Sequence, residues 1–167
     1  MSIELIVLDV DGTMTDSRIS YSETGDEVKS FNVKDGLGIA SWMRLGKKVA
    51  IITGRSSKIV ERRAKELHIE YCYQGIKDKR KTLSELLEKL DLTHEQVATI
   101  GDDLNDYTML QDAAISFVPK DATVAVEKIA TVTLSKRGGE GAVREMIDYL
   151  IEKEGLTQEL HRIWSVD

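Results

Sequence analysis

Short, mainly apolar runs and longer amphipathic stretches alternate along this chain. Residues 3–8 form the first such run, and its length and branched side chains are typical of a buried strand. Further strands are expected at 48–53, 69–73, 97–100, 114–118 and 132–134. Helical spacing of apolar residues predicts helices over 36–45, 57–68, 79–90, 104–111, 122–129 and 141–154. This alternation predicts an α/β, three-layer, Rossmann-like fold with a parallel sheet between helices.

One segment departs from this alternation. Residues 17–33 contain two stretches of alternating polarity around a turn at Gly25, a pattern that predicts a β-hairpin. Because the hairpin follows the first strand directly, we expect it to project over the edge where that strand ends. An isolated hairpin is marginally stable in water. We therefore expect it to pack against a partner subunit, as a flap within a homo-oligomer.

Composition narrows the class of protein. The 167 residues are enough for one domain, 1–167, with a core of its own. A net charge of −6 argues against a surface for nucleic acid or anionic membranes. Cys72, the only cysteine, excludes an internal disulfide. No leader is evident, and no apolar run approaches the roughly 18 residues of a membrane span, so a soluble, cytoplasmic protein is expected.

Two acids, Asp9 and Asp11, end the first predicted strand, and a Gly-Thr turn follows them. Unpaired buried charge is costly, so packing gives no reason to place two carboxylates there. Open α/β sheets bind ligands at the carboxyl edge of their strands. Taken alone, the same residues also fit a simple Asp-Gly turn that the acids cap.

Polar groups follow three later strands as well. They are Thr53 with Gly54 and Arg55, Lys79 at the start of a helix, and Gly101-Asp102-Asp103 with Asp106. Each fits a helix cap or an exposed charge when taken singly. Their joint presence at successive strand ends predicts one shared site at the carboxyl edge of the sheet.

In these four segments the chain resembles the haloacid dehalogenase superfamily of phosphohydrolases, whose motifs match in order. The likeness is closer to its small capless branch, typified by 3-deoxy-D-manno-octulosonate 8-phosphate phosphatases, and it spans about residues 3–151. The segments that carry it are the hairpin and residues 31–36, 73–75, 101–104 and 138–145.

The resemblance implies a phosphatase mechanism with named roles. Asp9 is the expected nucleophile and forms an aspartyl-phosphate. Asp11 is expected to protonate the leaving oxygen and then to deprotonate the attacking water. Thr53, the backbone amide of Gly54 and the Lys79 ammonium are expected to hold the phosphoryl group.

The same resemblance implies Mg²⁺ as cofactor, bound by Asp9, Asp102 and the backbone carbonyl of Asp11. Hard oxygen ligands suit Mg²⁺ better than zinc, and the motifs contain no histidine or cysteine. Asp103 and Asp106 are expected one shell further out, orienting Lys79 or metal-bound waters, with the division between them open.

A sugar-acid phosphate is the expected substrate. The gaps between motifs are too short for a cap domain, so the resemblance implies a homotetramer in which a neighbour's hairpin covers the site. The loop 138–141, including Gly138, Gly139 and Glu140, precedes a helix whose free N–H groups suit a sugar carboxylate. Arg55 and Arg144 could add a fork for that carboxylate. A tight turn at the loop and a surface position for Arg55 remain open.

Two residues bear on the length of the sugar acid. Many eight-carbon enzymes of this branch carry arginine where this chain has Glu140, whereas relatives acting on nine-carbon acids carry an acid there. Arg55 is the residue usual in the eight-carbon enzymes. We expect 3-deoxy-D-manno-octulosonate 8-phosphate, as in lipopolysaccharide biosynthesis, with a nine-carbon 9-phosphate as the alternative.

Other interpretations remain for the tail and for the class of protein. The tail, 157–167, has apolar residues outside the predicted core; it either reaches a neighbour's site, as the resemblance allows, or forms a packed or frayed terminus. A receiver domain also uses acids, threonine, lysine and Mg²⁺, although its motif order differs. A phosphatase-like module used only for oligomerisation is a further alternative, but such modules tend to lose the aspartates kept here.

Overall fold

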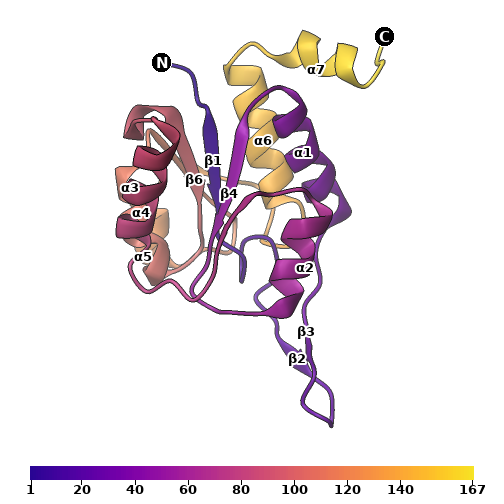
Figure 1. Cartoon of the computed structure of the whole chain (residues 1–167), viewed down its shortest axis with the longest axis vertical. Helices are drawn as coiled ribbons and strands as arrows, with labels where there is room; N and C mark the ends of the chain where they lie inside the picture. Colours follow the sequence, from indigo (N-terminus) through magenta and orange to yellow (C-terminus); the bar gives the residue numbers. More distant parts are fainter.

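A single six-stranded parallel sheet forms the centre of the computed structural model, which describes residues 1–167 (Figure 1). The strand order is β5-β4-β1-β6-β7-β8. The strands are β1 (Leu5–Leu8), β4 (Lys48–Ile52), β5 (Tyr71–Tyr73), β6 (Val97–Ile100), β7 (Ile115–Val118) and β8 (Val132–Thr133). Each pairs in parallel with its neighbours, as the alternation of strands and helices predicted.

Helices cover both faces of this sheet (Figure 1). One layer contains α1 (Val33–Arg44), α2 (Lys58–Glu66) and α6 (Ala142–Lys153). The other contains α3 (Lys79–Leu90), α4 (Tyr107–Asp112) and α5 (Val124–Glu127). Short 3-10 turns occur at η1 (His94–Gln96) and η2 (Leu104–Asp106). The three-layer α/β prediction is confirmed.

The central strand β1 shows how the two layers are held. Ile6 and Leu8 belong to the larger apolar cluster, which includes residues of α1, α2 and α6. Leu5 and Val7 belong to a second cluster, on the α3 side. All four are 0% exposed. Because both faces of the strand are covered, its sequence is a continuous apolar run.

Helix boundaries differ from the predicted ones where side chains cap the ends. Helix α1 begins at Val33 and not at residue 36, because the Asn32 side chain accepts hydrogen bonds from the N–H groups of Lys34 and Asp35. The helix expected at 104–111 opens as the η2 turn, which Asp103 caps, and continues as α4. Helix α5 is shorter than the predicted 122–129.

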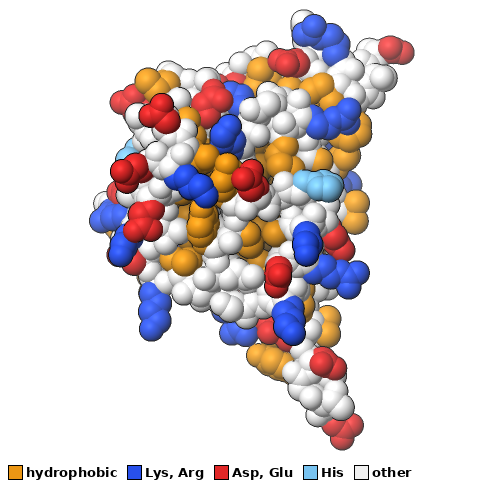
Figure 2. Space-filling view, in the orientation of Figure 1, with side chains coloured by type: hydrophobic (Ala, Val, Ile, Leu, Met, Phe, Trp, Pro, Cys, Tyr) orange, Lys and Arg blue, Asp and Glu red, His pale blue; other side chains and the backbone are white.

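The hairpin after β1 consists of β2 (Ser20–Tyr21) and β3 (Glu27–Val28). Its ladder has only the pairs Ser20↔Val28 and Tyr21↔Glu27. It projects from the carboxyl edge of the sheet as an arm beyond the body of the molecule (Figures 1 and 2). The predicted insertion is confirmed, with shorter strands than expected, and its packing on a partner stays a prediction.

The tail folds back as α7 (Thr157–Ile163) at the end of the molecule opposite the hairpin (Figure 1). Leu160 packs against the main core, and the Trp164 indole N–H donates to the Ser41 hydroxyl at 2.9 Å. The Arg44 guanidinium lies 4.4 Å from the centre of the indole ring. In this chain the packed-terminus interpretation therefore holds. No helix combines the length and the apolar character needed to span a membrane.

Candidate active site

A buried lysine and two buried aspartates form the centre of the site. Asp9 directly follows β1 and is 4% exposed, and Lys79 is the first residue of α3. The Lys79 ammonium donates to Asp9 Oδ1 at 2.7 Å and to Asp106 Oδ1 at 2.5 Å. The Lys79 side chain is entirely covered. Segments 70 residues apart in sequence thus meet at one edge of the sheet, as predicted.

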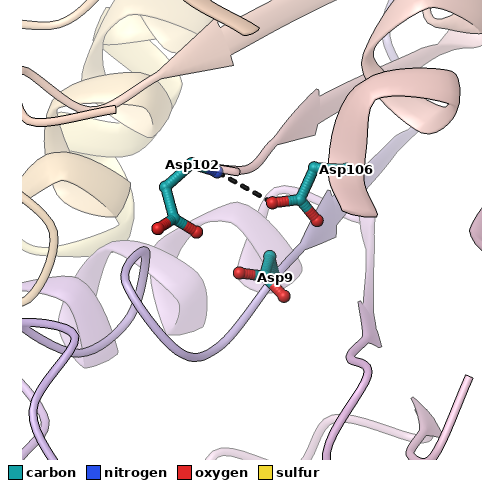
Figure 3. A group of neighbouring side chains, drawn as sticks. All are labelled: Asp9, Asp102 and Asp106. Atoms are coloured by element: carbon teal, nitrogen blue, oxygen red, sulfur yellow. Dashed lines mark hydrogen bonds between the residues drawn. The ribbon is translucent and has the colours of Figure 1, made fainter. Parts of the chain in front are cut away.

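Asp106 is the residue that fixes this arrangement. Its Oδ2 accepts the backbone N–H of Asp102 at 2.8 Å and of Asp103 at 3.2 Å, while Oδ1 binds Lys79 (Figure 3). With both oxygens engaged, Asp106 orients the Lys79 ammonium and the loop after β6. Asp103 caps η2 by accepting the Leu104 N–H at 2.7 Å. Asp103 and Asp106, whose roles the sequence did not distinguish, therefore lie in different surroundings.

Asp9, Asp102 and Asp106 converge, with one oxygen of each within 4.8 Å of the others (Figure 3). Burial, reinforced by the charge of Asp106, raises the pKa of Asp9 to about 6 against the opposing Lys79 ammonium. Burial and the charge of Asp9 raise the pKa of Asp102 to about 9. Three carboxylates thus face one ammonium, and the surplus negative charge suits a divalent cation.

The donor set favours Mg²⁺ because every available ligand atom is an oxygen. Since Asp106 is fully occupied by Lys79 and two N–H groups, Asp9 and Asp102 are the carboxylates left for a metal. Asp11 lies on the same loop, where its backbone carbonyl was predicted as a ligand. The predicted cofactor therefore fits the residues present.

The ammonium of Lys79 remains charged in this setting. Burial alone would lower the pKa of Lys79, but the carboxylates of Asp9 and Asp106 outweigh burial and raise it. Positive charge therefore persists beside Asp9, where a phosphate dianion has to approach a carboxylate.

A cavity of about 390 Å³ opens over these groups. Thr53, buried at the end of β4, is fixed by its backbone N–H bond to the Tyr73 carbonyl at 3.0 Å. The residues that line the cavity are Asp9, Asp11, Thr53, Gly54, Arg55, Asp102, Asp103 and Asn105. Seven of these eight residues were predicted from the sequence; Asn105 was not.

Asp11 is paired with a lysine from the hairpin. The Lys29 ammonium donates to Asp11 Oδ1 at 2.8 Å and lies 3.4 Å from Glu27 Oε1. Glu27 in turn lies 3.5 Å from the Arg55 guanidinium at the rim of the cavity. Lys29 and Glu27 were not among the predicted site residues, because lysine and glutamate on an alternating hairpin normally face solvent.

Thr13 was also missed, although it belongs to the first motif. Its hydroxyl lies 3.5 Å from Asp9 Oδ2 and 3.4 Å from Asp102 Oδ1, so it bridges the two metal-facing carboxylates. Its contact with Asp102, 89 residues later, could not be read from spacing, but its position in the Asp-Val-Asp-Gly-Thr segment was available as a signal.

The glycine loop supports the site from outside the cavity. The Gly138 N–H donates to Asp121 Oδ1 and the Gly139 N–H to the Thr13 carbonyl, each at 3.1 Å. A Cβ on Gly138 would lie 1.9 Å from the Gly12 carbonyl oxygen. Both loop N–H groups are thus used internally, and the predicted role of the following helix N-terminus toward a substrate anion stays a prediction. The loop needs glycine to approach the backbone that follows β1.

Glu140 and Arg144 do not reach the cavity either. The Arg144 guanidinium donates to both oxygens of Asp148, at 3.0 and 3.1 Å, one turn along α6. Glu140 and Arg144 line a separate polar hollow. The start of α6 faces α1, where the Arg144 N–H donates to Asp35 Oδ1 at 2.9 Å. Within one chain these two predicted substrate contacts are therefore not brought to Asp9.

Comparison with known proteins decides the family. Residues 74–147 match the model of the haloacid dehalogenase-like hydrolases. The chain is 41% identical over 158 residues to 3-deoxy-D-manno-octulosonate 8-phosphate phosphatase KdsC of Escherichia coli K12, which covers 95% of this chain and 84% of that protein. The chain belongs to the haloacid dehalogenase superfamily. It is a phosphatase of the capless branch that contains KdsC.

Solved structures agree with this assignment to the superfamily. The phosphatase of the same name from Moraxella catarrhalis, solved with a magnesium ion, a phosphate ion and a KDO molecule, superimposes with a TM-score of 0.92 at 36% identity. The match covers 96% of this chain and 93% of that one. The cobalt-bound Haemophilus influenzae phosphatase gives 0.89 at 37% identity, covering 92% and 90%. Membership of this superfamily sets aside the receiver alternative, and the likeness to a named phosphatase over 95% of the chain argues against the non-catalytic module.

Proposed function

We propose that this enzyme hydrolyses the phosphate monoester of a 3-deoxy-2-ulosonic acid, 3-deoxy-D-manno-octulosonate 8-phosphate, through an aspartyl-phosphate on Asp9. The observation that carries the proposal is the buried Lys79 ammonium, 2.7 Å from an Asp9 carboxylate that lines an open cavity. The likeness to KdsC over 95% of the chain supports the choice of substrate.

Asp9 is oriented for attack by its two neighbours. Lys79 holds Oδ1, whereas Oδ2 has only the 3.5 Å contact with the Thr13 hydroxyl and can approach phosphorus. The Asp9 oxygen–phosphorus bond forms as the bond from phosphorus to the sugar oxygen breaks. Thr53 and the Gly54 amide, which belong to the lining of the same cavity, hydrogen-bond the phosphoryl oxygens in the transition state in this proposal.

Asp11 carries the protons in both half-reactions. It gives its proton to the sugar oxygen as that oxygen leaves, which a poor alkoxide leaving group requires. It then takes a proton from the water that attacks phosphorus, and the bond to Asp9 breaks to release phosphate. One oxygen of Asp11 is held by Lys29, and the other is available to the reacting groups.

Asp9, Asp102 and the Asp11 carbonyl are the residues that would hold Mg²⁺. When bound, Mg²⁺ neutralises charge on the phosphoryl group and offsets the surplus of carboxylates. The magnesium ion in the Moraxella catarrhalis structure and the cobalt in the Haemophilus influenzae structure support a divalent cation here.

Arg55 is the residue we assign to the sugar carboxylate, because it is the one cation at the rim of the cavity with a half-exposed side chain. It also favours the eight-carbon acid over the nine-carbon one, and Glu140 lies outside the cavity. A homotetramer, with a neighbour's hairpin over each site, and a cytoplasmic location both stay predictions.

The first experiment measures phosphate release from two substrates side by side, with and without Mg²⁺. These are 3-deoxy-D-manno-octulosonate 8-phosphate and the 9-phosphate of the nine-carbon relative. A higher kcat/KM for the former, dependent on Mg²⁺, is the expected result. A preference for the latter would assign the nine-carbon substrate and make Glu140, through a neighbouring subunit, the residue to test next. Turnover of neither would reject a 3-deoxy-2-ulosonic acid phosphate as substrate.

The role of Asp9 is tested with Asp9→Asn. We expect turnover to fall on the order of 10⁴-fold with the fold retained, because the nucleophile acts as one unit with its neighbours. Mass spectrometry after rapid acid quenching should show phosphate on the Asp9 peptide of the unmodified enzyme. Substantial turnover by the variant would remove Asp9 from the nucleophile role.

A further inference from the structure

Lys29 is an unusual residue for its position. From Asp16 to Lys34 it is the only buried residue, although the hairpin around it projects into solvent (Figure 1). Its side chain is 0% exposed, the same value as that of Lys79 in the core. A lysine is almost never fully buried unless its charge is paired. The group that pairs with the Lys29 ammonium therefore indicates the role of this buried lysine.

That partner is the expected proton donor. The Lys29 ammonium lies 2.8 Å from Asp11 Oδ1, and Asp11 lines the reaction cavity. Lys29 itself does not line the cavity. With no exposed surface it has no route to a substrate in this arrangement, so any effect on the reaction passes through Asp11.

Few backbone contacts hold the hairpin itself together, although Phe31 at its base packs against the main core. The hairpin ladder contains two residue pairs, and a hairpin of that size is marginal on its own. Glu27, on β3 two residues before Lys29, lies 3.4 Å from the Lys29 ammonium and 3.5 Å from the Arg55 guanidinium. The charges Asp11, Lys29, Glu27 and Arg55 therefore form a chain from the proton donor to the rim of the cavity.

We infer that Lys29 is a positioning residue for Asp11: by holding Oδ1, it aims Oδ2 at the leaving oxygen and ties proton transfer to the contact between the hairpin base and the loop after β1. This inference rests on the proposed function, in which Asp11 protonates the sugar oxygen. It goes further by assigning a part in that step to a residue outside the four motifs.

The inference makes a selective prediction about leaving groups. A sugar alkoxide needs a proton as it departs, whereas an aryl oxide such as p-nitrophenolate departs without one. The ratio kcat/KM reports steps up to departure of the leaving group and excludes hydrolysis of the aspartyl-phosphate. A residue that aims the proton donor should therefore affect kcat/KM for sugar phosphates far more than for p-nitrophenyl phosphate.

The experiment compares Lys29→Met with the unmodified enzyme on both substrates at saturating Mg²⁺. We expect kcat/KM for the sugar phosphate to fall about 30-fold, a part of the roughly 10²–10⁴-fold that general acid catalysis contributes, and that for p-nitrophenyl phosphate by less than about threefold. Lys29→Arg, which keeps the charge, should recover part of the loss. Lys34→Met, which removes an exposed lysine just beyond the hairpin, should match the unmodified enzyme on both.

The outcomes separate this inference from the proposed function. Retained aryl activity shows that the Lys29→Met variant is folded and that its phosphoryl-transfer groups are intact. Equal losses on both substrates would make Lys29 a structural residue and overturn the inference, as would no loss on either. In an Asp11→Asn background, Lys29→Met should cause no further loss, because the two residues act in one step. If the unmodified enzyme hydrolyses no sugar phosphate, the proposed function fails, independently of Lys29.

Discussion

Two fully covered lysines bind the two acids of one short segment, and they come from opposite kinds of structure. Lys79 opens helix α3 in the core and binds Asp9 at 2.7 Å. Lys29 lies on the projecting hairpin and binds Asp11 at 2.8 Å. The first pair is surrounded by further partners, whereas Asp11 keeps 21% of its side chain exposed.

The Lys79–Asp9 ion pair is built into the core, whereas the Lys29–Asp11 ion pair depends on the position of the hairpin. Lys79 is held by Asp106, which the backbone of the β6 loop also binds, so the charge beside Asp9 does not depend on any projecting segment. Lys29 reaches Asp11 only while the hairpin base lies over the sheet. In the proposed mechanism, phosphoryl transfer and leaving-group protonation are supported from different parts of the molecule, and mutations should separate them.

Of the two lysines, the core one should show the larger effect when it is replaced. Lys79→Met removes a charge from the transition state and leaves Asp9 and Asp106 buried without it. Activity should fall on the order of 10³-fold on sugar and aryl phosphates alike. The free energy of unfolding in the absence of metal should fall by about 3 kcal/mol. Kinetics on both substrates and urea denaturation measure these changes, with the exposed neighbour Lys77→Met as control.

If Lys79→Met lowered activity on the sugar phosphate but not on the aryl phosphate, the two lysines would not differ in the way proposed. It would mean that Lys79 also serves the proton-transfer step. Stability equal to that of the unmodified protein would show that the buried carboxylates take up protons without cost.

A change at the metal site, like one at Lys79, should affect sugar and aryl phosphates equally. Asp102→Asn removes one of two carboxylates free for Mg²⁺, so the Mg²⁺ concentration for half-maximal activity should rise at least about tenfold. The rise should be the same for sugar and aryl phosphates. Activity titrations with Mg²⁺ measure it, and Asp26→Asn at the exposed hairpin tip is the control. An unchanged requirement for Mg²⁺ would remove Asp102 from the ligand set.

A smaller effect is expected at Asp35, buried where the hairpin enters α1. Burial raises the pKa of Asp35 to about 6, although the hydrogen bond from the Arg144 N–H and the charges of Arg63 and Arg144 act to lower it. The folded state therefore binds this proton more tightly than the unfolded one. That contribution to stability is complete below about pH 4 and is lost as pH rises through about 6.

Relative to Asp35→Asn, the unmodified protein should thus lose about 2 kcal/mol of unfolding free energy between pH 4 and pH 7. Urea denaturation of both proteins across this range, with a chelator present, gives the difference. Parallel curves would show that Asp35 titrates normally. Activity of Asp35→Asn on the sugar phosphate should be unaffected, which would separate the fold beneath the hairpin from the Lys29 contact.

The smallest effect lies outside both lysine sites. Arg144 is held by Asp148 and lines a different hollow from Asp9. Arg144→Met should change kcat/KM for the sugar phosphate by less than about twofold. A large rise in KM would restore Arg144 as a substrate contact, delivered by a neighbouring subunit rather than by its own chain.

Most of the sheet could be predicted because buried parallel strands have continuous apolar sequences, as β1 shows. The side chains at the strand ends could be predicted because the topology brings all carboxyl ends to one edge. The start of α1 was misplaced by three residues, since Asn32 caps the helix before its apolar spacing begins.

Tertiary contacts account for what the sequence did not reveal. Lys29 resembles any exposed hairpin lysine until the fold places it above Asp11. The glycine loop was predicted as a substrate contact, and its spacing gave no sign that the Gly138 N–H donates to Asp121, 17 residues earlier. The Arg144 guanidinium donates to Asp148, one turn along its own helix. The sequence gave no sign of this pairing, and Arg144 was therefore predicted to bind the substrate carboxylate together with Arg55.

The docking of Trp164 on α1 has a spectroscopic consequence. The chain has two tryptophans, and the other, Trp42, is buried in the same helix. Neither lines the cavity around Asp9. Tryptophan emission therefore reports on the α1 layer: the partly exposed Trp164 signals release of α7, and the covered Trp42 signals opening of the core. The protein carries an optical probe of its own unfolding that is remote from the reacting groups.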